Sequence, residues 1–193
     1  MRRIDEYWVI FDQEEKTNFL VGLGFDLAAA IKGAVILVFL VFALCFRVVG
    51  VEGPSMQETL HDQDWLAVTG MATHYDRGDI VVITQPWERG VPIIKRIIAK
   101  GGDTIDIDFD RHTVTVNGQI LDEPYTAAPT SLSYDVEFPL TVEEGKVFVM
   151  GDNRNDSLDS RSSKIGQIDE NYILGKAFIR FWPLHQWNIY ENA

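Results

Sequence analysis

The chain has 193 residues, which leaves room for one domain and an anchor and excludes two full-sized domains. Its net charge of -12 at pH 7 argues against nucleic acid as a partner, because phosphate binding requires clustered basic residues. Cys45 is the only cysteine, so the sequence excludes an intramolecular disulfide.

The first predicted element is a transmembrane helix over residues 33–51. Every residue from 33 to 46 is apolar and the run continues beyond Arg47, which gives 19 residues with one charge. A spanning helix needs about 20 apolar residues, and an arginine near its end can reach the headgroups. A buried core helix is the alternative, but the β-rich sequence that follows offers no obvious groove for it. A cleavable signal peptide fits poorly, since 32 residues precede the run.

Residues 1–32 are expected to form a cytoplasmic and interfacial segment. Residues 19–31 are apolar apart from Asp26, so the helix can begin earlier or follow an interfacial helix. Four basic residues precede the apolar run and one, Arg47, follows it, which favours an N-terminus on the inner side of the membrane. The four are Arg2, Arg3, Lys16 and Lys32.

Residues 52–193 are predicted to form an all-β domain. Short runs rich in Val, Ile and Thr alternate there with Gly, Pro, Asn and Asp. The dipeptide Asn117-Gly118 predicts a tight hairpin turn, and residues 122–135 predict a surface loop. The expected strands are 79–84, 92–99, 104–110, 113–116, 119–121, 146–150 and 176–182.

Ser55 is the candidate nucleophile. It lies four residues after Val51, and four extended residues reach only about 14 Å, so its hydroxyl is expected near the membrane surface. A lone serine in a turn is usually structural, and a serine hydroxyl needs an adjacent base before it becomes a nucleophile. The assignment therefore depends on the residues that accompany Ser55.

Lys95 is the candidate base. Strand alternation places it on one face with Ile93 and Ile97, and places Arg96 on the other face between Ile94 and Ile98. Apolar surroundings can lower the pKa of a lysine, whereas an arginine stays charged. A free lysine titrates near pH ~10.4, and full burial can lower that pKa by the ~3 needed for a base at neutral pH. A snorkelling lysine at a sheet edge is the alternative.

The four histidines offer a competing base. They lie in polar or loop-like surroundings, and none has an aspartate placed to suggest a catalytic triad. Surface positions explain them adequately. They are His61, His74, His112 and His185.

The polar loop after the strand at 146–150 is the most distinctive stretch of the chain. It runs Gly-Asp-Asn-Arg-Asn-Asp-Ser-Leu-Asp-Ser-Arg from Gly151 to Arg161. A calcium loop is excluded, because Arg154 takes the third ligand position and Ser163 replaces the glutamate of the twelfth. A plain acidic loop is the remaining structural alternative.

Together these motifs resemble the bacterial type I signal peptidases, over essentially the whole chain from the anchor onward. The nucleophile box is Gly53-x-Ser55-Met56, and Gly78-Asp79-Ile80-Val81 resembles a strand box. Lys95-Arg96 followed by Gly102-Asp103 resembles the base box. The loop from Gly151 to Arg161 matches the remaining box in every fixed position, and this match is highly specific.

The resemblance implies the roles of the site residues. Ser55 would be the nucleophile, Lys95 the general base, and Ser157 the hydroxyl that orients the lysine. Asp159 and Arg161 would form an ion pair, with Asp152 as a further partner. The Ser55 backbone amide, with Gly53 and Met56, would serve the oxyanion and the substrate. The implied fold is a signal-peptidase or LexA-like domain of coiled antiparallel sheets behind one N-terminal transmembrane helix.

The implied function is removal of signal peptides from secreted preproteins, with cleavage after small residues of the Ala-x-Ala type. The enzyme would be single-pass in the bacterial plasma membrane, with its catalytic domain outside, preproteins and lipid as partners, and no metal or cofactor. Glycine at position 53 resembles the Gram-positive branch. Glu58 and Gly101 replace prolines common in the family, which puts the shape of the cleft in doubt.

Two other functions fit parts of the sequence. A tethered binding module could keep the fold without activity, but it would be free to lose Ser55, Lys95 and Ser157. A self-cleaving regulator of the related Ser-Lys type would couple to a DNA-binding element, and the acidic balance offers none. An interfacial patch of Trp65, Phe178, Phe181 and Trp182 is a further expectation, although aromatic strand residues are more often core.

Overall fold

The computed structural model describes residues 4–70, 74–84 and 91–190. The chain divides into two compact units, Met1–Leu44 and Cys45–Ala193. Arg2 and Arg3, on which part of the predicted orientation rests, lie outside the described residues.

The first unit is the helix α1, which runs from Ile4 to Cys45. Its segment Val21–Ala43 has 23 residues, a mean hydropathy of 2.3 and no side chain buried within the protein. At 1.5 Å per residue this segment is about 34 Å long, which matches the hydrocarbon core of a bilayer. By length and composition it can therefore cross a membrane.

The predicted end of the helix, Val51, is wrong. Residues Phe46–Gly50 form the strand β1 instead, paired antiparallel with β2 (Trp65–Thr69) from Phe46 opposite Thr69 to Gly50 opposite Trp65. The apolar run is continuous across this boundary, but Val48 and Val49 are β-branched and favour the extended backbone once a partner strand is available.

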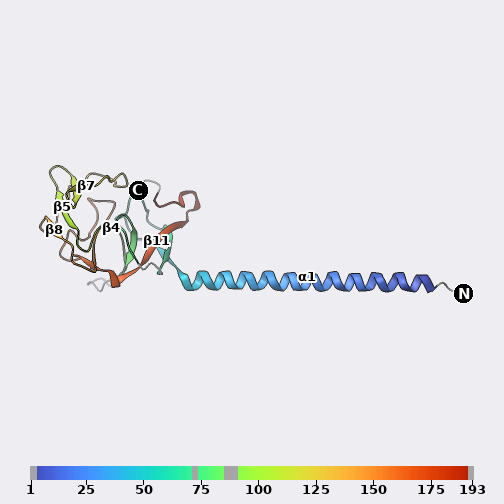
Figure 1. Cartoon of the computed structure of the whole chain (residues 1–193). Coiled ribbons are helices and arrows are strands. Elements are labelled where there is room, and N and C mark those ends of the chain that lie inside the picture. Colours follow the sequence, from blue (N-terminus) through green and yellow to red (C-terminus); the bar gives the residue numbers. More distant parts are fainter. Residues whose placement is uncertain (1–3, 71–73, 85–90, 191–193) are drawn as a thin grey trace. The chain divides into compact units, whose positions relative to one another are not determined.

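The second unit is built on a seven-stranded antiparallel sheet, in the order β1-β2-β11-β3-β4-β9-β10. Figure 1 labels two of these strands, β4 and β11. Strand β11 has register shifts after Ala177 and after Arg180. The remaining strands of this sheet are β3 (Ile80–Ile83), β4 (Ile93–Lys100), β9 (Lys146–Met150), β10 (Ile168–Asp169) and β11 (Ile173–Trp182).

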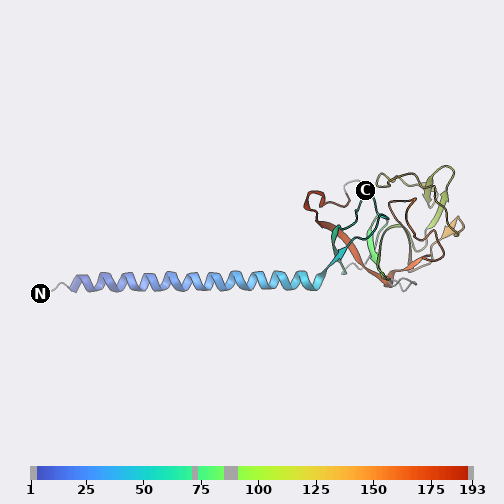
Figure 2. The same ribbon diagram turned by 180° about the vertical axis from the view of Figure 1, so that it is seen from behind.

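A second sheet has four strands in the order β7-β6-β5-β8 and lies at the end of the β-domain away from β11 (Figures 1 and 2). Asn117 and Gly118 turn between β6 and β7 with φ of 55° and 77°, as the predicted hairpin requires. The strands of this second sheet are β5 (Thr104–Asp108), β6 (Thr113–Val116), β7 (Gln119–Ile120) and β8 (Leu140–Thr141). The β-domain also contains two short 3-10 helices, η1 (Glu170–Tyr172) and η2 (Leu184–Gln186).

Three apolar clusters fill the β-domain. One joins the segment after β1 to β2 and β3, the second lies between β3, β4 and β9, and the third holds the small sheet against β4 and β9. All four residues of β3 are buried, because the strand is covered on both faces. The predicted all-β fold is confirmed.

Candidate active site

Ser55 lies in a tight turn that follows β1. Gly53 has φ +84°, a conformation that favours glycine, and its amide donates to Asp62 Oδ1 at 2.9 Å. Met56 and Leu60, 1% and 0% exposed, pack into the core and fix the turn. Met56, expected at the substrate, is thus a core residue, whereas Ser55 stays partly exposed.

Lys95 comes from the middle of β4 and reaches this turn. Its side chain is 3% exposed, and Nζ donates a hydrogen bond to Ser55 Oγ at 2.7 Å. Burial lowers the pKa of Lys95 from 10.5 to about 8, although the carboxylates of Asp159 and Asp152 oppose this effect. The amine is therefore largely desolvated, and near pH 8 about half of it is neutral.

Two buried arginine–carboxylate pairs surround the amine. Arg161 Nε and Nη2 each donate to Asp159 at 2.8 Å, and both side chains are fully buried. Asp152 does not join that pair: Arg96 donates to it at 2.9 and 2.7 Å. The two carboxylates near Lys95 are thus each paired with their own arginine, and Arg161 offsets part of the negative charge that would hold the lysine protonated.

Gly151 and Ser157 lie directly beside the nucleophile. A Cβ on Gly151 would lie 2.2 Å from Ser157 Oγ and 2.4 Å from the Ser55 carbonyl oxygen, so only glycine fits there. Ser157 is 4% exposed, and its hydroxyl has no hydrogen-bond partner among the described residues. Its expected hydrogen bond to Lys95 is therefore absent in this geometry.

Comparison with known proteins identifies the family. The family model "Signal peptidase, peptidase S26" matches residues 25–182. A signal peptidase I of Bacillus licheniformis is 38% identical, covering 90% of this chain and 96% of its own. Signal peptidase I T of Bacillus subtilis is 36% identical, covering 90% and 91%. The chain belongs to the signal peptidase family.

A solved signal peptidase I of Enterococcus faecalis is also similar to this chain. It is 32% identical, with a TM-score of 0.43, and the match covers 54% of this chain and 97% of that one.

As a member of this family the chain is a serine endopeptidase that removes signal peptides from preproteins. It is anchored in a membrane, and α1 provides the one candidate spanning segment in the described part of the chain. The signal-peptidase resemblance read from the four boxes is thus confirmed at the level of the family.

None of the four histidines takes the place of Lys95 beside Ser55 in the described part of the chain. His74, His112 and His185 are exposed, His61 is partly exposed, and no histidine side chain hydrogen-bonds to Ser55 Oγ among the described residues. The described residues also hold no cluster of three or more metal-ligating side chains.

Sequence reasoning missed the partners of the two inner arginines. The strand pattern predicts only that Arg96 lies on the opposite face from Lys95. In the structure Arg96 pairs with Asp152, which lies 56 residues further along the chain. Arg154 pairs with Glu123 from a stretch predicted to be a plain surface loop. The available signal was the position of Arg96 in an isoleucine-rich strand, since a buried arginine requires a carboxylate.

Proposed function

We propose that this signal peptidase cleaves preproteins with Ser55 as nucleophile and neutral Lys95 as general base. The observation that carries the proposal is the 2.7 Å contact between Lys95 Nζ and Ser55 Oγ, at an amine that burial leaves about half neutral near pH 8. Lysine is an established alternative to histidine in activating a serine.

The proposed reaction begins when Lys95 Nζ takes the proton from Ser55 Oγ as that oxygen attacks the scissile carbonyl carbon. The tetrahedral oxyanion is stabilised by the backbone amide of Ser55. The ammonium then gives its proton to the leaving amine. A water deprotonated by the same Nζ attacks the acyl-enzyme, and Nζ returns that proton to Ser55 Oγ as the ester bond breaks. Every proton passes through one side chain, and the mechanism uses no metal or cofactor.

Ser157 is proposed to orient the lysine during this cycle. Its hydroxyl is buried and has no partner among the described residues, so it is available to accept a hydrogen bond from the ammonium when the proton is on Nζ. Such a bond would stabilise the tetrahedral intermediate, in which the lysine carries the proton.

The substrate is proposed to be a secreted preprotein whose signal ends in small residues of the Ala-x-Ala type. The four sequence boxes and the signal peptidase relatives support this specificity. We place the enzyme as a single-pass protein in the bacterial plasma membrane, with residues 52–193 outside. Arg2, Arg3 and Lys16 precede the apolar segment Val21–Ala43, whereas only Arg47 follows it closely, and this excess supports that orientation.

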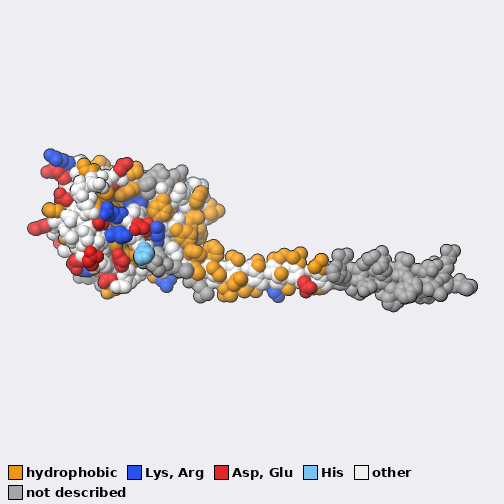
Figure 3. Space-filling model, in the orientation of Figure 1, with side chains coloured by type: hydrophobic (Ala, Val, Ile, Leu, Met, Phe, Trp, Pro, Cys, Tyr) orange, Lys and Arg blue, Asp and Glu red, His pale blue; other side chains and the backbone are white. Residues whose placement is uncertain are grey.

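Lipid is a further proposed partner of the β-domain. Hydrophobic side chains gather on one side of it (Figure 3). Trp65 and Trp182 are paired between β2 and β11, and these two residues and Trp187 are 46%, 59% and 59% exposed. The register shifts of β11 turn Phe178 and Phe181 outward as well, each 38% exposed. Tryptophan prefers the interface of a bilayer, and this surface belongs to the unit that begins directly after α1.

The test is cleavage of a preprotein with an Ala-x-Ala site in detergent. Wild type should cut it, whereas Ser55→Ala and Lys95→Ala should abolish cleavage with the fold retained. Lys100→Ala is the matched control, because Lys100 is on the same strand and pairs with Asp76 at the surface. Cleavage by Lys95→Ala at an undiminished rate would overturn the proposal.

A further inference from the structure

Residues 122–136 form a strap along the loop 151–161. The strap contains no helix or strand, and its backbone contacts reach from Asp152 to Arg161 of this loop. The contacts at its two ends are Ala127 N to Asp152 O at 3.2 Å and Val136 N to Arg161 O at 3.2 Å. Between them Asn155 Oδ1 accepts hydrogen bonds from Ser131 N and Leu132 N at 3.0 Å each. Arg161 Nη1 donates to Leu132 O at 2.8 Å, and Tyr134 OH donates to Ser157 O at 3.0 Å.

The strongest link between strap and loop is an ion pair. Arg154 donates from Nη1 and Nη2 to the two oxygens of Glu123 at 2.8 and 2.7 Å. The Arg154 side chain is fully buried and that of Glu123 is 12% exposed, so this bidentate pair is screened from water. A buried guanidinium without its carboxylate would be strongly unfavourable, which makes Glu123 decisive for where Arg154 lies.

Arg154 connects this pair to the reacting groups. Its Nε donates to the Gly151 carbonyl at 3.0 Å, and its own carbonyl accepts from Arg161 Nη2 at 2.7 Å. Gly151 lies so close to the Ser55 carbonyl and the Ser157 hydroxyl that no side chain fits at this position. A shift of Arg154 is therefore transmitted through one hydrogen bond to the backbone in contact with the nucleophile.

Tyr125 links the Glu123 carboxylate to Arg96, the other buried arginine near the site. Its hydroxyl donates to Glu123 Oε1 at 3.0 Å, and its ring lies 3.9 Å from the Arg96 guanidinium carbon. Arg96 in turn holds Asp152, one of the two carboxylates near Lys95. Glu123 is thus tied to both inner arginines.

We propose that Glu123 is a positioning residue for catalysis, which acts through Arg154 and Gly151 to hold the Ser55–Lys95 geometry. This inference rests on the proposed Ser-Lys mechanism. The Glu123 carboxylate binds Arg154 and Tyr125, and among the described residues it contacts neither Ser55 nor Lys95, so its effect on the reaction is indirect.

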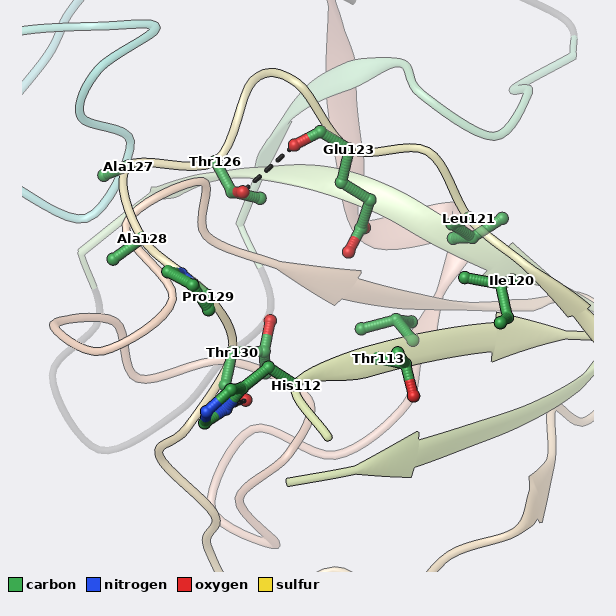
Figure 4. Close-up of a pocket in the computed structure, with 11 residues that line it drawn as sticks. His112, Thr113, Ile120, Leu121, Glu123, Thr126, Ala127, Ala128, Pro129 and Thr130 are labelled. Carbon is green, nitrogen blue, oxygen red and sulfur yellow. Dashed lines mark hydrogen bonds between the residues drawn. The ribbon is translucent and has the colours of Figure 1, made fainter. Parts of the chain in front are cut away.

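Glu123 also lines a cavity beside the strap, so part of its side chain borders open space rather than packed neighbours. The volume of the cavity is about 360 Å³, and Figure 4 shows Glu123 and the stretch Thr126–Thr130 curving around it, opposite Thr113 and Ile120. The near-isosteric Glu123→Gln change fits this space without overpacking, so it removes the charge and leaves the local shape intact.

The test compares wild type, Glu123→Gln and Glu143→Gln on a preprotein, with kcat and KM measured separately. Glu143 forms a surface pair with Lys146 at 2.7 Å outside the strap and loop, so it controls for the chemistry of the substitution. Glu123→Gln should lower kcat about tenfold or more with KM within about threefold, because small misplacements of reacting groups carry large rate penalties. Glu143→Gln should match wild type.

A second variant and a second readout complete the design. Arg154→Lys keeps the charge but loses the fork that binds Glu123 and Gly151 together, and it should show the same kcat loss. Hydrogen exchange of the 151–161 amides should be faster in both variants, with β3 and β4 unchanged. If a folded variant keeps a kcat within twofold of wild type, the inference is overturned. An inactive wild type would instead overturn the proposed function.

Discussion

The pH dependence of cleavage is the sharpest consequence of the buried lysine. With the pKa of Lys95 lowered to about 8 by burial, only the fraction of enzyme with a neutral amine can react. That fraction is about half at pH 8 and about 1% at pH 6, so kcat/KM should fall by roughly 50-fold between these values, with a limiting slope of one decade per pH unit. A hydrated lysine with its ordinary pKa of 10.5 would be less than about 1% neutral at pH 8.

The assay is cleavage of a soluble peptide with an Ala-x-Ala site in detergent from pH 5 to 10. Initial rates at low substrate give kcat/KM, whose acid limb reports the free enzyme. The expected apparent pKa is near 8. An acid limb near 6.5 would indicate a histidine base, and one near 10.4 a hydrated lysine, and either would refute the reasoning.

Three further predictions concern the same site. Lys95→Met should abolish cleavage and yet raise the free energy of unfolding by up to about 3 kcal/mol below pH 8. The reason is that the lysine of the wild type binds its proton up to pH ~10.4 in the unfolded state but only up to about pH 8 in the folded state, which favours unfolding. Urea unfolding at pH 7 measures this difference, and a urea midpoint equal to that of wild type contradicts it. Gly151→Ala should lose activity at least about 100-fold, because its Cβ would lie 2.4 Å from the Ser55 carbonyl oxygen; retention of wild-type kcat would be inconsistent with that contact. Asp152→Asn should cost about 3–5 kcal/mol by leaving Arg96 buried without its carboxylate, and a change in unfolding free energy below about 1 kcal/mol would count against this.

Local patterns predicted the parts of the fold that depend on neighbours in sequence. Asn117-Gly118 required positive φ and gave the hairpin where expected. Lys95 was expected on a strand with Ile93 and Ile97, and β4 carries it there with Val81 of β3 as its cross-strand partner. Both features follow from one or two residues and a period of two.

The features that sequence reasoning missed depend on long-range pairing. β1 was assigned to the helix because an apolar run does not reveal whether its last residues will meet a partner strand, here β2. Strands β8 and β10 have two residues each, too few for a pattern. The Arg96–Asp152 and Arg154–Glu123 pairs join residues 56 and 31 positions apart, and no local signal specifies such partners.

The strap shows the same limit in the functional site. Residues 122–135 have the composition of a surface loop, and most of their side chains indeed face solvent or lie at the surface. Their backbone and the Glu123 carboxylate nevertheless supply partners for the loop that contains Ser157. Composition describes exposure, whereas the identity of a hydrogen-bond partner is settled only when the chain is folded.

The most direct measurement is the ionisation of the Lys95 amine itself. Selective labelling of lysine side chains with carbon-13, with Lys95→Met to assign the signal, allows NMR titration of Nζ in the folded enzyme in detergent. The account expects a midpoint near pH 8 for Lys95, well below that of the exposed lysines. A midpoint at about 10.4, shared with those surface lysines, would contradict it.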